Sequence, residues 1–156
     1  MSNFPNHTLL DAVNVDILKA LAATPRMTTA ELARAVGMSG PAVRERMQRL
    51  EETGVIRGFR LDLDSKLLGY PVEAFIRVRP MPGRLPKIVE LAQSMPRVVE
   101  CHRITGEDCF IMRVHLESVE ALDSILDVFL AHGQTATSLV QSTPVPRRSL
   151  PLPDVG

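Results

Sequence analysis

Polar side chains suited to contacting nucleic acid are concentrated in one helical segment of the sequence. Val43, Met47 and Leu50 recur at spacings of four and three, so they form the buried stripe of a helix, and the polar residues between them project outward. Arg44 can donate to a guanine edge or a phosphate, and Gln48 can bond to adenine. The candidate DNA contacts in and around this segment are Thr28, Ser39, Gly40, Pro41, Arg44, Glu45, Arg46, Gln48, Arg49 and Arg57.

The elements around this segment predict how it is presented. A helix with one apolar face begins at Leu10 and ends before Pro25, and the sequence T-T-A-E from Thr28 is a capping box that opens a short second helix. The third helix carries the polar cluster. Residues 55–63 alternate and are rich in Val, Ile, Phe and Leu, which predicts a strand or hairpin. Three short helices followed by a strand pair predict a winged helix-turn-helix over residues 8–60.

This arrangement places the N-terminal part of the third helix in the major groove of DNA. Thr28 and Ser39 lie at helix N-termini, where backbone N–H groups can bind phosphate. Arg57 and Arg60, on the predicted wing, are candidate contacts to the DNA backbone.

Two plainer interpretations of the same residues stay open. A three-helix unit with exposed arginines can be a protein-interaction module. Arg46 and Arg49 can also simply pair with Glu45, Glu51 or Glu52 on a solvated helix face.

The second half of the chain alternates between strand and helix patterns. The order β-α-β-β-α-β is that of a ferredoxin-like, ACT-like domain, predicted over residues 72–145 after a linker at 61–71. An extended, proline-rich tail is predicted over 146–156. The fold class is therefore α+β, and one face of the four-stranded sheet is left for burial against a second subunit. The predicted strands are 72–80, 98–104, 110–116 and 135–143, and the predicted helices are 85–95 and 119–129.

Composition excludes several classes of protein. The chain has 156 residues with 18 basic and 18 acidic side chains, so it is not a polybasic coat protein for nucleic acid. Residues 1–60 carry a net charge of +2 and the remainder −2. The sequence has no signal-peptide pattern and no run approaching 18 apolar residues, and its two cysteines suit reduced thiols, so a cytoplasmic protein without membrane contact is expected.

Four segments resemble the Lrp/AsnC family of prokaryotic transcription regulators, in order and over nearly the whole chain from Leu10 to about Leu152. Residues 10–21 are similar to the family pattern L-D-x-x-D-x-x-I-L-x-x-L, with Asn14 where Asp is usual. Residues 31–39 resemble E-L-A-x-x-V-G-L-S, and residues 43–56 resemble V-x-x-R-V-x-R-L-E-x-x-G-V-I. Residues 99–110 resemble the strand-turn-strand that ends in T-G-x-x-D-x, although Cys109 replaces the usual acidic residue and Asp108 precedes it.

The resemblance implies that the second domain senses a small effector, usually an amino acid. Glu107 or Asp108 would hold the ammonium group of the effector, and Gly106 would let the backbone approach closely. Alternation of side chains along the strand would place Asp108 on the face opposite to the acidic residue of the family pattern. The residues from Thr105 to Asp108 also suit a plain polar hairpin turn. The candidate effector-binding residues are Thr105, Gly106, Glu107, Asp108, Thr135 and Thr137.

The sequence therefore predicts a DNA-binding transcription regulator that responds to an amino acid. The resemblance implies dimers, and further assembly into tetramers or octamers. Neither a metal, a resident cofactor nor catalysis is expected, because the four histidines form no catalytic or metal-binding pattern. The alternative is an amino-acid-sensing regulatory subunit that acts on a partner enzyme without binding DNA.

Overall fold

Three helices form in the first third of the chain, and each begins at a residue that the sequence marks. Asp11 caps α1 (Ala12–Ala23) by accepting a hydrogen bond from the Asn14 N–H. Thr28 and Glu31 form the predicted capping box at the start of α2 (Thr29–Ala35). Ser39 caps α3 (Gly40–Glu52), accepting from the Ala42 N–H. The predicted starts of α2 and α3 are confirmed, because their caps act between residues three apart, whereas α1 begins at Ala12 and not at the predicted Leu10.

The computed structural model describes residues 9–154, which divide into two compact units with boundaries at 61/62 and 146/147. The segment from Arg147 is grouped with the three helices, and residues 62–146 form the second unit. The described residues of the tail, up to Asp154, form no helix or strand. None of the helices in residues 9–154 is long and apolar enough to cross a membrane.

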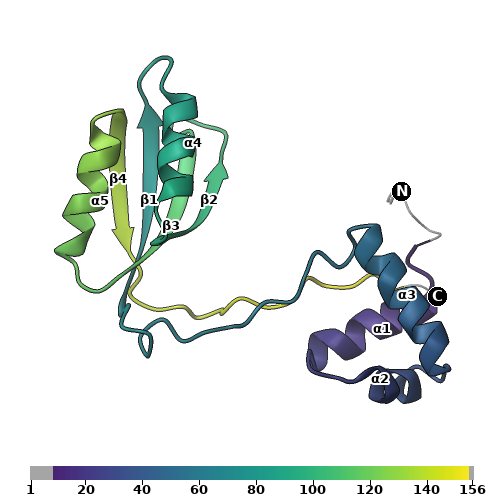
Figure 1. Cartoon of the computed structure of the whole chain (residues 1–156). Helices are drawn as coiled ribbons and strands as arrows, with labels where there is room; N and C mark the ends of the chain where they lie inside the picture. Colours follow the sequence, from purple (N-terminus) through teal and green to yellow (C-terminus); the bar gives the residue numbers. More distant parts are fainter. Residues whose placement is uncertain (1–8, 155–156) are drawn as a thin grey trace. The chain divides into compact units, whose positions relative to one another are not determined.

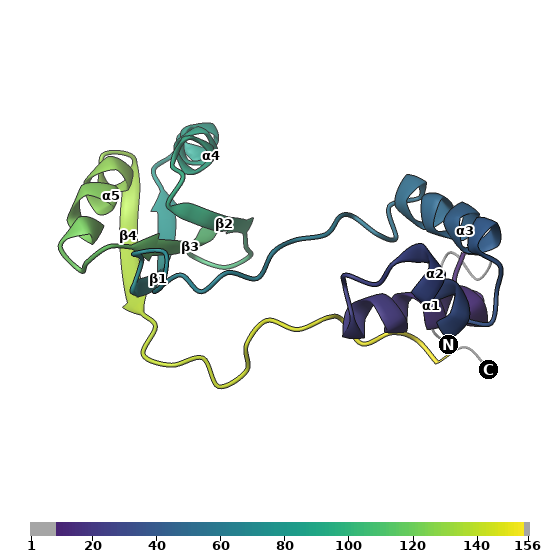
Figure 2. The same ribbon diagram turned by 60° about the horizontal axis from the view of Figure 1, so that its bottom comes forward.

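The three helices lie together in one unit (Figures 1 and 2), and all three contribute side chains to its apolar core. Val43 and Leu50 of α3 are buried, as the sequence predicts, and Met47 packs against them half-buried. The remaining core side chains come from α1 and α2: Ile17, Leu21, Leu32 and Ala33. With this stripe buried, the opposite side of α3 is free to face a ligand.

The prediction of a strand or hairpin over residues 55–63 is wrong. The structure contains no strand in this segment, which follows α3 without regular structure. Ile56 packs against the core of the three helices, but Phe59 is 58% exposed and Leu61 is 85% exposed, so the later apolar side chains of the segment are not buried. A strand needs a hydrogen-bonding partner, and no neighbouring segment of the described chain pairs with this one.

The second unit is a four-stranded antiparallel sheet covered on one face by two helices (Figure 1). The strand order is β2-β3-β1-β4, as the predicted β-α-β-β-α-β succession requires. Ile76 and Met112 lie on the covered face, where they pack with Ile88 of α4 and Phe129 of α5. The elements are β1 (Val72–Pro80), α4 (Leu85–Ser94), β2 (Val98–Arg103), β3 (Phe110–Leu116), α5 (Ala121–Leu130) and β4 (Gly133–Leu139).

The last strand begins and ends earlier than predicted. It was expected over residues 135–143, but β4 starts at Gly133, opposite Pro80. A Cβ atom at position 133 would lie 2.4 Å from the carbonyl oxygen of Arg79, so only glycine permits this close approach. The prediction followed the β-branched residues and missed the glycine that sets the register.

Within residues 62–146, no helix or strand covers the other face of the sheet. We call it the open face. Strand pairing places opposite residues on the same side, so Arg77 shares this face with Ile111 and Ala136. Its members are Glu73, Phe75, Arg77, Arg79, Glu100, His102, Ile111, Arg113, His115, Gln134, Ala136 and Ser138.

Candidate nucleic-acid interface and effector turn

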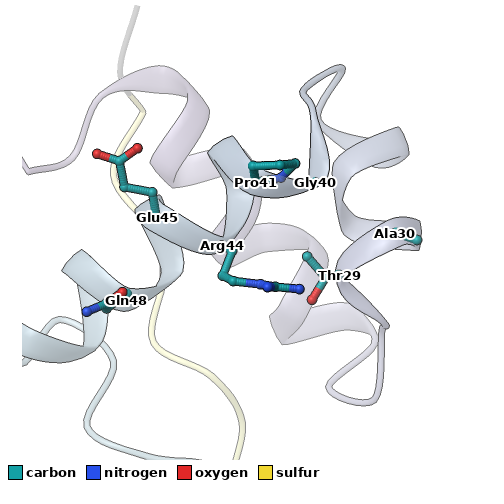
Figure 3. Close-up of a pocket in the computed structure, with 7 residues that line it drawn as sticks. All are labelled: Thr29, Ala30, Gly40, Pro41, Arg44, Glu45 and Gln48. Atoms are coloured by element: carbon teal, nitrogen blue, oxygen red, sulfur yellow. The ribbon is translucent and has the colours of Figure 1, made fainter.

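The start of α2 and the outer side of α3 enclose a shallow hollow of about 470 Å³ (Figure 3). The Arg44 side chain extends toward Thr29, across the space between the two helices. Five of the ten predicted DNA contacts line this hollow: Gly40, Pro41, Arg44, Glu45 and Gln48. Thr29 and Ala30 line it too, and the sequence analysis missed them. Their position directly after the Thr28 cap was the available signal.

Thr28 is committed to capping its own helix. Its N–H and its hydroxyl both donate to the Glu31 carboxylate at 2.7 Å, and its hydroxyl accepts from the Glu31 N–H. These hydrogen bonds hold the pKa of Glu31 below its ordinary value. A phosphate at this point would have to displace a carboxylate, so the geometry does not favour the predicted phosphate contact by Thr28.

Arg46 is tied to α1 and does not pair with the glutamates of its own helix. Its Nη1 donates to Asp11 Oδ2 at 2.6 Å and to Asn14 Oδ1 at 2.9 Å. Asn14 is buried, and its Nδ2 donates to the carbonyl of Leu9 at 2.8 Å. An aspartate at position 14 could not donate to the carbonyl of Leu9, because an ionised carboxylate only accepts hydrogen bonds. Asn14 thus fits a site where the family pattern has Asp.

The ion pair also affects Asp11. Partial burial raises the pKa of Asp11, but hydrogen bonds from Arg46 and from the Asn14 N–H outweigh that effect, and the net pKa lies below the ordinary value. Arg46 therefore joins α3 to the start of α1. We interpret it mainly as a residue that positions α3.

Three charged side chains on the outside of α3 are unengaged. Within residues 9–154, the side chains of Arg44, Glu45 and Arg49 have no hydrogen-bonding or ion-pair partner. Gln48 donates from Nε2 to Glu52 Oε1 at 2.7 Å, which fixes the orientation of its amide. An arginine that need not break an existing pair is the better candidate for binding DNA.

The remaining predicted contacts lie outside the hollow. Ser39 caps α3 with its hydroxyl, and its position at the N-terminus of a 13-residue helix still suits a nearby phosphate. Arg57 is exposed in the segment after α3, where the predicted wing strand is absent. Its contact with DNA stays a prediction.

The turn between β2 and β3 brings its two carboxylates against arginines of β1. The Ile104 N–H donates to the Cys109 carbonyl at 2.8 Å and closes the turn, and Gly106 lies within it at φ +108°. Glu107 forms an ion pair with Arg79. The Asp108 carboxylate lies 3.8 Å from both Arg77 Nε and Arg79 Nε.

Arg77 and Arg79 were not among the predicted site residues. The signal was present in the sequence, because both alternate with the apolar residues of one strand. Their presence changes the chemistry of the turn. The carboxylates and the guanidinium groups of this turn are paired with each other, so a zwitterionic ligand would have to exchange its own carboxylate and ammonium group for these partners.

The structure does not bring Thr135 and Thr137 to this turn within one chain. Thr135 lies opposite buried Val78 and Thr137 opposite buried Ile76, so both point to the helix-covered side of the sheet. The arginines that hold the turn lie on the other side. Sequence alternation alone could not show this, because only the pairing of β4 with β1 decides which faces of the two strands coincide.

A second charged cluster occupies the open face around Arg113. Its Nη1 lies 3.8 Å from the Glu73 carboxylate, and its Nε lies 3.5 Å from that of Glu100. Glu100 also contacts His102, with 2.9 Å between Oε1 and Nε2. Every arginine of the open face is thus paired with a carboxylate. No group of three or more His, Cys, Asp or Glu residues between 9 and 154 is placed to hold a metal ion.

A helix-turn-helix with free arginines, joined to a βαββαβ unit, defines the class of DNA-binding regulators with a separate sensor domain. Two family models match this chain. Residues 10–57 match a winged helix-turn-helix DNA-binding domain, and residues 73–150 match the Lrp/AsnC ligand-binding domain. The chain therefore belongs to the Lrp/AsnC family of helix-turn-helix transcription regulators.

Individual relatives agree with this membership. The chain is 36% identical over 134 residues to YezC, an uncharacterised HTH-type transcriptional regulator of Bacillus subtilis (strain 168), covering 86% of this chain and 95% of that one. It is 34% identical over 136 residues to the leucine-responsive regulatory protein of Rhizobium meliloti (strain 1021), covering 85% of each. The crystal structure of the regulator NMB0573 of Neisseria meningitidis in complex with L-Met superimposes with a TM-score of 0.84 at 26% identity, over 91% of this chain and 96% of that one.

Proposed function

We propose that the outer side of α3 is the DNA-contacting surface of this regulator, with Arg44 as its principal cation. The observation that carries the proposal is the unpaired Arg44 guanidinium beside Thr29, in the hollow between α2 and α3 (Figure 3). A regulator of this kind would act by binding, on chromosomal DNA in the cytoplasm. The test is a titration of the full-length protein on promoter fragments of its own operon, with footprinting at low and higher salt.

We further propose that the turn from Thr105 to Asp108, together with Arg77 and Arg79, binds an amino-acid effector. A relative of known structure was crystallised with L-Met, which supports a zwitterionic ligand for the family domain. The arginines suit the carboxylate of such a ligand, and Asp108 suits its ammonium group once an arginine is drawn away. No resident cofactor enters this proposal.

Self-association completes the proposal. The open face carries Phe75, 37% exposed, among its paired charges, and residues 55–63 carry exposed apolar side chains. A second copy would cover both, giving a dimer in which two α3 helices meet a two-fold site. Assembly into tetramers or octamers would then bring effector turns of different dimers together.

The effector proposal is tested by thermal-shift screening of the twenty amino acids, with gel filtration of each mixture that responds. At least one amino acid should raise the melting temperature of the full chain, because a ligand that binds the native state stabilises it. Asp108→Asn should abolish that rise. Glu117→Gln, which removes a carboxylate paired with Arg97 elsewhere in the same unit, should keep it.

The outcomes separate the parts of the proposal. An unchanged shift in Asp108→Asn would reject the turn as the binding site. Gel filtration of the protein without effector reads the assembly directly, and a monomer at micromolar concentration would reject the proposed dimer.

A further inference from the structure

The outermost line of α3 is acidic, although the surface is proposed to approach DNA. Successive residues of an α-helix are rotated by about 100°. Relative to buried Val43 and Leu50, the side chains directly opposite the core are those of Pro41, Glu45 and Gln48. We call these three residues and Glu52 the crest of α3. Arg44 and Arg49 flank the crest on its two sides.

The flanking arrangement is visible in the structure. Figure 3 shows Arg44 reaching toward Thr29, while Glu45 points away from that side of the helix. Glu45 also lines a second hollow of about 340 Å³ on the other side of α3, with Asp11, Met38 and Arg49 among its residues. Glu45 thus separates the two hollows, at the part of the helix that would enter the groove most deeply.

The Glu45 carboxylate has no partner within residues 9–154. Arg49 follows it by one helical turn, yet no ion pair joins the two side chains. The carboxylate is therefore not neutralised locally. A negative charge facing DNA weakens binding to every duplex through repulsion by phosphates, unless a donor on a base edge meets it.

We propose that Glu45 determines sequence specificity by accepting a hydrogen bond from the N4 amino group of cytosine in the major groove. The proposal rests on the outer side of α3 being the DNA-contacting surface. Guanine and thymine present only acceptors to that groove, and adenine places the N7 acceptor beside its N6 donor. Cytosine offers its amino group without an acceptor on the same base edge, so it is the base that a carboxylate tolerates best.

The flanks and the crest then have different tasks. Arg44 and Arg49 lie on opposite sides of the crest and suit the phosphates of the two strands bordering the groove. The repulsion between Glu45 and DNA is offset only at a site where the amino group of cytosine donates to the carboxylate. Glu45 thereby lowers affinity for wrong sites and leaves affinity for the right site intact.

The test selects binding sites for the full-length protein from a randomised duplex library, and then measures affinity by fluorescence anisotropy. The wild type should select cytosine at one position of each half-site. Changing that C·G pair to T·A should weaken binding by about tenfold, because an acceptor replaces the donor. In Glu45→Gln the same change should matter less than about twofold, since an amide can accept from cytosine or donate to thymine.

Glu51→Gln is the matched control. It removes the same charge from an exposed residue of α3 that lies off the crest. It should keep the tenfold preference for cytosine, and it should raise affinity for random duplex less than Glu45→Gln does, because its carboxylate lies farther from the groove.

Two results would overturn the role assigned to Glu45. One is a Glu45→Gln variant that selects the same sites as the wild type with the same preference for cytosine. The other is a wild type that shows no preference for cytosine. Wild-type affinity in Arg44→Ala would instead reject the DNA-contacting surface itself. The failure of the specificity proposal is therefore distinguishable from failure of the surface on which it rests.

Discussion

Arginines occupy two surfaces of this protein, and their partners differ between them. On α3, Arg44 and Arg49 have no partner within the described residues. On the open face of the sheet, Arg77, Arg79 and Arg113 are each paired with carboxylates. The first surface keeps its positive charge available, and the second neutralises its own.

This difference matches the partner that each surface would meet. A polyanion such as DNA supplies the negative charge that free arginines need. A second copy of the same face brings identical charges, so each copy must first be neutral if two faces are to meet without repulsion. The zero formal net charge of the chain therefore hides one surface whose arginines are unpaired and one surface whose arginines are paired with carboxylates.

The largest expected effect that tests the difference between the two surfaces is a loss of DNA affinity. Arg44→Ala should weaken binding to a random duplex by at least about tenfold and make the salt dependence shallower, because one phosphate contact per chain is lost. Arg97→Ala removes the same charge from the sheet unit, where Arg97 pairs with Glu117, and should change affinity less than about twofold. Anisotropy titrations at several salt concentrations measure both. Equal losses in the two variants would mean that bulk charge, and not α3, drives binding.

A smaller effect separates the two kinds of arginine within α3 itself. Arg46→Ala should lower the free energy of unfolding by about 1–2 kcal/mol, because it leaves the buried oxygen of Asn14 without a donor. Arg49→Ala should change it by less than about 0.5 kcal/mol, since Arg49 is exposed and unpaired. Urea unfolding followed by circular dichroism measures both. A stable Arg46→Ala variant with reduced DNA affinity would return Arg46 to the contact surface.

The smallest effect is a dependence on pH. The pKa of Asp11 is lowered in the folded protein, so its contribution to stability is present above the unfolded value of about 3.9 and is lost as pH falls through the folded value. Asp11→Asn keeps a good helix cap and removes only the charge. The wild type should exceed this variant by about 0.5 kcal/mol at pH 7, because the pair is half-exposed.

That advantage should shrink as the pH falls through the lowered pKa of Asp11 in the folded protein, because protonation removes the charge that distinguishes the two proteins. Thermal melts of the two proteins at pH 7, 5 and 3 give the comparison. A difference that stays constant with pH would show that the Arg46–Asp11 pair does not hold α1 to α3.

Much of the fold followed from local signals in the sequence. The capping box at Thr28 and the cap at Ser39 predicted where α2 and α3 begin, because capping acts over three residues. The strand at Phe110–Leu116 was predicted with its true limits, since its alternation matches one buried and one open face. The strand over residues 55–63 failed because alternation says nothing about whether a pairing partner exists.

The candidate sites were predicted less completely than the fold. The sequence marked Arg44, Gln48 and the turn at Gly106, all of which stand out by type and spacing. It could not show that Thr135 faces away from that turn, because only the pairing of β4 with β1 decides which side of the sheet Thr135 shares with buried Val78.

The sequence alone determined the helices, their caps, the order of the strands and the family, because these depend on residues close together in the chain or on motifs in a fixed order. Only the tertiary structure decided which charged side chains are free. Asp11 lies 35 residues before Arg46, and Glu107 lies 28 residues after Arg79, so no local pattern announces either pair. Packing α1 against α3, and β1 against β3, joined these charges and left Arg44 and Glu45 unpaired on the surface of α3.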